Sequence, residues 1–138
     1  METVLLLVHA EPNGRLGKPA LEAAGTAKTI AGAAGATLAA GIVGGEVASA
    51  ATRLAALGAS RIAGVAGPEF AEPRYATDAL AAESLCRATG ATVVIAPHTS
   101  RWARCLPGVA QRLGGRVDTH VTAVSISGGK LAVTRWYY

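Results

Sequence analysis

The stretch VLLLVH, residues 4–9, decides the fold. It has no polar side chain before His9, and a short continuous apolar run is typical of a strand buried on both faces of a parallel sheet. Such strands occur in proteins that alternate strands with helices, because the helices cover both faces of the sheet. The stretch therefore predicts an α/β protein and an alternating chain on its C-terminal side.

The segments that follow alternate as expected. Apolar residues at spacings of three and four, ended by glycines, predict helices over residues 19–34, 46–57 and 76–89. Short apolar runs predict strands over residues 37–43, 61–66 and 92–96. A fourth helix ends at Leu113 and is expected to start near residues 102–104, because a proline deep in a helix, here Pro107, clashes with the preceding turn.

Residues 117–126 and 130–136 alternate around Ser127-Gly128-Gly129, which predicts a hairpin. The predicted fold is a single domain, residues 1–138, with a Rossmann-like three-layer α/β/α architecture and a mostly parallel sheet with a C-terminal β-hairpin. Parallel strands end at one edge of their sheet, where such folds bind ligands. Residues 9–14, 44–46, 67–70 and 97–101 are expected to share that edge.

The composition limits the chemistry that the chain can carry. It has 31 alanines and 17 glycines but only six aromatic residues, three histidines and two cysteines. Small side chains suit close packing of helices on a sheet and leave few groups to build a reactive pocket. The first strand is followed by His9-Ala10-Glu11-Pro12, without a glycine-rich dinucleotide turn, and no P-loop, H-E-x-x-H or G-x-S-x-G motif occurs.

Two weak constellations remain open. His9 and His98 both follow strands, and Glu11 is the nearest third ligand for a metal; the alternative is ordinary hydrogen bonding, and no metal is expected. Cys105 lies near a helix start close to Arg101 and Arg104, which would lower its thiol pKa; the alternative is a packed thiol. We therefore expect no catalytic residue.

The segment from Arg101 to Arg116 contains four arginines and no acid. On a helix Arg101, Arg104 and Arg112 lie within about 80° of one another. They form either a solvated outer face or a surface for an acidic protein partner or a phosphate. Nucleic acid is not expected, because no stacking aromatic residues or DNA-reading motif accompany the arginines.

The chain is expected to be cytoplasmic, with no membrane insertion. Its apolar run at residues 4–8 is too short for a secretory signal and follows the acidic Glu2. The uncharged residues 29–45 are interrupted by glycines. Cys86 and Cys105 have no ligand spacing, which suits free thiols in a reducing compartment.

Several short segments recur in one known family. The first strand ends in Ala10-Glu11, followed by Asn13-Gly14-Arg15-Leu16; later come Pro97-His98-Thr99-Ser100-Arg101, Leu106-Pro107, Arg112-Leu113-Gly114 and residues 118–122, 129–131 and 134–138. In this order the chain resembles, over its whole length, the N-terminal domain of the electron transfer flavoprotein alpha subunit. It departs at Trp102-Ala103-Arg104-Cys105, where the family usually has Gly-Arg-Asp, and at Trp136, where it usually has proline.

The resemblance implies an electron-transfer module without its own catalytic site. In that family the alpha subunit forms a heterodimer with a beta subunit and carries FAD, which takes electrons from acyl-CoA or other dehydrogenases to a membrane quinone reductase. The FAD is held mainly by a C-terminal domain of alpha, which is absent here, so no cofactor-binding residue is assigned in this chain. Its implied role is to dock the beta subunit, with Thr99, Ser100 and Arg101 as the expected contacts.

Two other functions remain as alternatives. The glycine-bearing sheet edge, with Ser100 and Arg101 near a helix start, also fits a small stand-alone domain that binds an adenine nucleotide. A thiol or metal enzyme would use Cys105, or His9 with His98.

Overall fold

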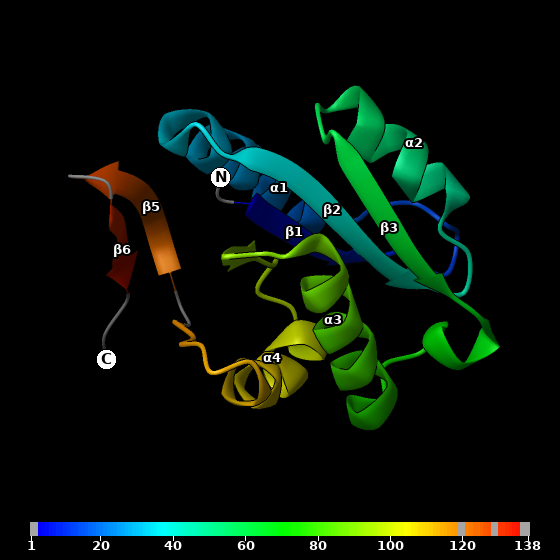
Figure 1. Ribbon diagram of the computed structural model, residues 1–138. Helices are drawn as coiled ribbons and strands as arrows, with labels where there is room; N and C mark the ends of the chain where they lie inside the picture. Colours follow the sequence, from blue (N-terminus) through cyan, green and yellow to red (C-terminus); the bar gives the residue numbers. More distant parts are fainter. Residues whose placement is uncertain (1–2, 119–120, 128–129, 136–138) are drawn as a thin grey trace.

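The computed structural model describes residues 3–118, 121–127 and 130–135 (Figure 1). Four parallel strands form the main sheet in the order β3-β2-β1-β4: β1 (Thr3–His9), β2 (Thr37–Gly44), β3 (Arg61–Ala66) and β4 (Val93–Ile95). The helices between and after them are α1 (Lys18–Ala34), α2 (Ala48–Ala56), α3 (Tyr75–Thr89) and α4 (Ser100–Arg112). The predicted three-layer α/β class is therefore confirmed.

The stretch VLLLVH lies in the middle of the protein, because β1 has a strand on each side and helices on both faces. Val4, Leu6 and Val8 pack into the core beneath α1 and α2. Leu5 and Leu7 pack into the core beneath α3 and α4. Every residue from Val4 to Val8 is buried, which confirms a strand covered on both faces.

Alanine and glycine let the helices approach the sheet closely. A Cβ atom added at Gly41 on β2 would lie 3.0 Å from Leu85 Cδ1 on α3 and 3.1 Å from Leu7 Cδ2 on β1. One at Gly64 on β3 would lie 2.9 Å from Val47 Cγ2. Leu85 of α3 therefore fills the space beside Gly41, and Val47, which directly precedes α2, fills the space beside Gly64.

Helix α4 begins earlier than predicted. It starts at Ser100, and Pro107 lies inside it, so the expectation of a start near residues 102–104 was wrong. Thr99 precedes the helix and its Oγ1 accepts a hydrogen bond from the backbone N–H of Trp102 at 3.5 Å. Buried residues lie on both sides of the proline, so burial of this face outweighs the roughly 3 kcal/mol that an interior proline costs.

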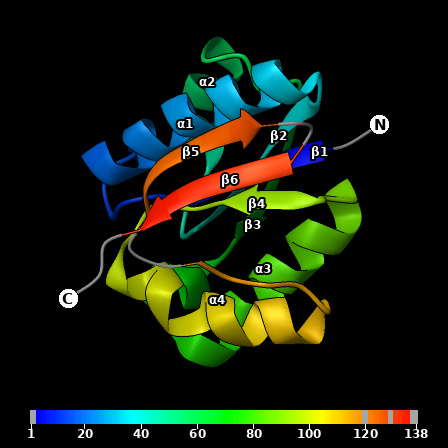
Figure 2. The same cartoon turned by 90° about the vertical axis from the view of Figure 1, so that its left-hand side faces the viewer.

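The last two strands form a sheet of their own. β5 (Val121–Ser127) and β6 (Lys130–Arg135) pair antiparallel and do not join the parallel sheet. Figure 2 shows β5 lying beside α1, and Val124 packs against the core on that side. Residues 117–118 of the predicted strand over 117–126 are not in a strand, and residues 119–120 and the predicted turn at residues 128–129 lie outside the described residues.

The close approach at Gly41 gives a stability prediction. Gly41→Val is expected to destabilise the protein by about 1–3 kcal/mol, because the added atoms overpack a filled core. Gly25→Ala is the control: an added Cβ at Gly25, inside α1, meets no atom within 4 Å, and alanine favours a helix by about 0.5–1 kcal/mol. Urea unfolding measures both. A Gly41→Val protein as stable as the parent would contradict this packing.

Candidate functional site

The carboxyl ends of the parallel strands meet at one edge, as predicted. The backbone N–H of Ala10, after β1, donates to Val43 O at 2.9 Å, and that of Gly67 donates to Gly44 O at 3.2 Å. The chain leaves β1 for β2 on one side and later reaches β4 on the other side. This reversal is where open α/β sheets bind ligands, so the candidate site lies between the ends of β1 and β4.

A buried ion pair lies behind this edge. Asp78 on α3 and Arg101 on α4 form two parallel hydrogen bonds of 2.9 Å, from Nε to Oδ2 and from Nη2 to Oδ1. The side chains are 2% and 4% exposed. This two-point geometry is the strongest arrangement for a guanidinium and a carboxylate, and it offsets the cost of removing both charges from water.

The same pair also holds the chain between β3 and α3. Arg101 Nη2 donates to the backbone oxygen of Phe70 at 2.7 Å, and Phe70 belongs to the short 3-10 helix η1 (Pro68–Phe70). The backbone N–H of Arg74 donates to Asp78 Oδ2 at 3.2 Å. One guanidinium and one carboxylate therefore tie α3, α4 and the segment before α3 together.

This pairing corrects the predicted basic face of α4. Arg101 points inside rather than joining Arg104 and Arg112 on an outer surface. Arg112 lies 3.5 Å from Glu83 of α3, which also pairs with Arg87. The acids that pair with Arg101 and Arg112, which are Asp78 and Glu83, both come from α3, and the sequence of residues 101–116 contains no sign of them.

The three predicted contact residues have different surroundings. Ser100 is exposed at the first position of α4, while Thr99 is half-buried and caps the helix. Arg101 is buried, and the contacts of its guanidinium lie within the chain. The segment is thus held in one conformation with Ser100 on its surface.

His9 at the end of β1 packs against Trp102, with ring centroids 6.2 Å apart. Burial lowers the pKa of His9, and the nearby Arg101 guanidinium lowers it further; Glu11 and Asp78 act in the opposite direction. His98 is exposed. Among the described residues, no three metal-ligating side chains come together.

Cys105 differs from the expectation of a lowered pKa. It is fully buried on the inner side of α4, and burial raises the pKa of its thiol to about 11 despite the arginines nearby. Asp78 acts in the same direction as burial. The thiol is therefore protonated and enclosed at neutral pH, which is the reverse of an activated nucleophile.

Asp78 is the residue that the sequence reading missed. It directly precedes Ala79 on the inner face of α3, together with Ala82 and Leu85. An acid among the apolar residues of a helix face is seldom buried without a partner. An acid on the apolar face of one helix, together with arginines on the next helix, could have predicted this ion pair from the sequence.

Together these features define a small three-layer α/β domain with its candidate site at the switch between β1 and β4. The family model described as the electron transfer flavoprotein domain matches residues 4–138. The chain therefore belongs to the electron transfer flavoprotein domain family, a family of electron-transfer modules. No curated protein matches it. Within the described ranges, no helix combines the length and the apolar character needed to cross a bilayer.

The ion pair gives a second stability prediction. Arg101→Met should destabilise the protein by about 3–5 kcal/mol, because it leaves the Asp78 carboxylate buried without its partner. Asp78→Leu combined with Arg101→Met should recover most of that loss, because no unpaired charge remains. Arg104→Met on the exposed side of α4 is the control and should stay within about 0.5 kcal/mol. An Arg101→Met protein no less stable than Arg104→Met would contradict the assignment.

His9 gives a prediction of pH dependence. Because its folded pKa is below the ordinary value of 6.5, the unfolded chain binds the proton more readily. The contribution of His9 to the free energy of unfolding is therefore fully present above about pH 6.5, where the ring is neutral in both states. It is lost as the pH falls from about 6.5 through the folded pKa, because the unfolded chain takes up the proton first. An NMR titration of the His9 ring should give a midpoint below 6.5; a midpoint at or above 6.5 would contradict its burial beside Arg101.

Proposed function

We propose that this chain is the N-terminal domain of an electron transfer flavoprotein alpha subunit and that it docks the beta subunit. The observation that carries the proposal is the family match over residues 4–138, which includes both the parallel sheet and the β5–β6 pair. The short sequence segments quoted above, from Ala10-Glu11 to residues 134–138, occur in the same order as in the alpha subunit and favour that subunit within the family. The expected assembly is a cytoplasmic heterodimer.

The proposed contact is the segment Thr99-Ser100-Arg101 at the start of α4. Ser100 offers an exposed hydroxyl, while Thr99 caps the helix and Arg101 anchors it to Asp78. A segment that is already ordered loses less conformational freedom when a partner binds. In this arrangement Ser100 contacts the beta subunit, and its two neighbours hold it in place.

FAD enters the proposal as the cofactor of the complete protein, where it would carry electrons from a dehydrogenase. The described residues at the sheet edge are poorly suited to hold it. Trp102 is 1% exposed and its enclosed Nε1 has no hydrogen-bond partner among the described residues, so this ring cannot stack on a flavin. Arg101 already serves Asp78 and Phe70. We therefore assign the flavin to the C-terminal domain of alpha, with help from beta, and to this domain the role of framing it.

Co-purification tests the docking. The chain, co-expressed with its matching beta subunit, should be retained with that subunit at an equimolar ratio. Ser100→Trp should weaken retention at least about tenfold, since a large side chain blocks a closely packed contact. Ser84→Trp, at an exposed serine on α3, is the matched control and should bind as the parent does.

Failure of the chain to associate, while full-length alpha does, would overturn the docking role. Association that is equally tight in the Ser100→Trp and Ser84→Trp proteins would remove Ser100 from the contact.

The reversal of strand order between β1 and β4 favours one second candidate, the binding of an adenine nucleotide at that edge. Calorimetry of the chain with ATP, AMP and FAD separates the two functions. Micromolar binding of an adenine nucleotide would favour the nucleotide-binding domain, and its absence would favour the docking module.

A further inference from the structure

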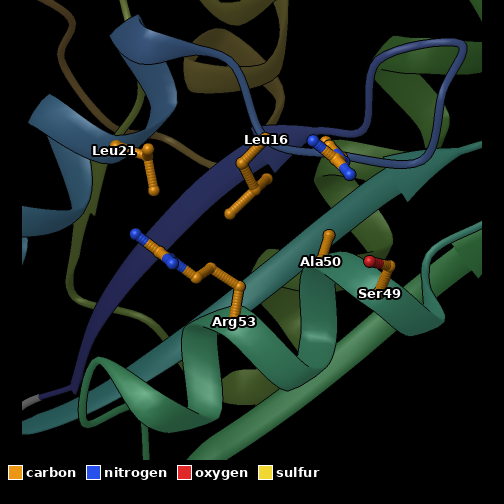
Figure 3. A pocket seen from close by; sticks show the side chains of 6 residues that line it. Leu16, Leu21, Ser49, Ala50 and Arg53 are labelled. Atoms are coloured by element: carbon orange, nitrogen blue, oxygen red, sulfur yellow. The ribbon is translucent and has the colours of Figure 1, made fainter.

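A separate pocket lies between α1 and α2, on the opposite face of the sheet from Asp78 and Arg101. Its volume is about 340 Å³. Its lining comes from the end of the β1–α1 loop, the first half of α1 and helix α2, with Arg53 in the last turn of α2: Arg15, Leu16, Leu21, Ser49, Ala50 and Arg53 (Figure 3). The pocket is thus built by two helices and a loop that adjoin the carboxyl edge of the sheet.

The polar lining is basic and unneutralised. Arg15 and Arg53 contribute guanidinium groups and Ser49 a hydroxyl, and none of the described acids lines the pocket. Within the described part of the chain, no carboxylate lies within 4.0 Å of either guanidinium. Two unpaired arginines on one pocket attract an anion, and a planar guanidinium matches the oxygen atoms of a phosphate or a carboxylate.

The apolar lining lies beside these charges. Figure 3 shows Arg53 extending from α2 towards Leu21 of α1, with Leu16 on the adjacent side of the pocket. Leu16 and Leu21 are each half-buried. A ligand therefore meets cationic groups and an apolar surface at once, which is the usual composition of a small-molecule pocket.

The backbone that carries both arginines is fixed. Asn13 Oδ1 accepts the backbone N–H of Arg15 at 2.9 Å, and Arg15 O accepts that of Glu11 at 2.8 Å. Arg53 lies on α2 directly before Leu54, whose side chain is 1% exposed and anchors the helix to the core. The backbone positions of the two exposed arginines are therefore set without ligand, so binding does not require the loop to order first.

We propose that this pocket binds a small organic phosphate. Its phosphoryl group would pair with Arg15 and Arg53, and a short apolar portion would lie on Leu16 and Leu21. The volume is near the lower end of the range for small-molecule pockets, roughly 300–1,000 Å³. A compact phosphate with an apolar portion would contact both the arginines and the leucines of this pocket. The acidic side chains of a protein partner would contact only the arginines.

Phenyl phosphate is the probe, titrated into the isotope-labelled chain and followed by NMR of the backbone amides. Saturable shifts are expected at residues 13–16 and at the first turn of α2, with weaker binding of inorganic phosphate and none of phenol. Arg53→Gln should weaken phenyl phosphate binding about tenfold, the factor for one charged hydrogen bond. Arg104→Gln removes the same charge from α4, where its side chain is exposed, and should leave the affinity unchanged.

The proposal is overturned by equal weakening from both substitutions, by shifts spread over the whole basic surface, or by binding of a glutamate-rich peptide at this pocket without binding of phenyl phosphate. Failure here leaves beta-subunit docking unaffected, because the contact proposed for that role is at Ser100. Shifts confined to His9 and Ser100 would instead assign the phosphate to the β1–β4 edge and overturn the pocket.

Discussion

The buried pair of Asp78 and Arg101 is the interaction on which the candidate site depends. Each charge would be costly to bury alone, and each is satisfied only because the other is present. The guanidinium also binds the backbone of Phe70, and the carboxylate also binds that of Arg74. Two helices and the segment before α3 are therefore fixed by one contact. The exposed Ser100, next to Arg101, takes its position from it.

Small side chains set the rest of the architecture. The core beneath α1 contains five alanines and one isoleucine from that helix, while three of its large apolar residues, Val4, Leu6 and Val8, come from β1. On the opposite face, the tight space between Gly41 and Leu85 shows that α3 also lies close to the sheet. The fold is thus stabilised by close contact between its layers. The charged pair Asp78–Arg101 lies at the sheet edge, and Arg15 and Arg53 line the pocket.

Most of the fold could be predicted because its signals are local. The run at residues 4–8, the spacing of apolar residues in α1 to α3 and the glycines that end them depend only on near neighbours. The start of α4 could not be predicted in this way, because burial on both sides of Pro107 outweighs a local rule. The separate pairing of β5 and β6 is also outside the reach of periodicity, which shows alternation but not the sheet that a strand joins.

The site was harder to predict than the fold for the same reason. Arg101 was identified as a candidate contact, but its partner lies 23 residues earlier on another helix, so its burial had no local sign. The pocket joins Arg15 and Arg53 from separate elements, which no single segment suggests. The resemblance that indicated the electron transfer flavoprotein family was likewise spread over many short segments rather than one motif.

The most direct test of the central contact is NMR of the arginine side chains in the native protein. A guanidinium held by three hydrogen bonds away from water should give a separate Arg101 Nε–H signal that exchanges slowly and shows proximity to Asp78. The signals of exposed arginines such as Arg104 should exchange fast. An Arg101 signal that exchanges with water as fast as that of Arg104 would contradict the buried pair and the ordered edge that depends on it.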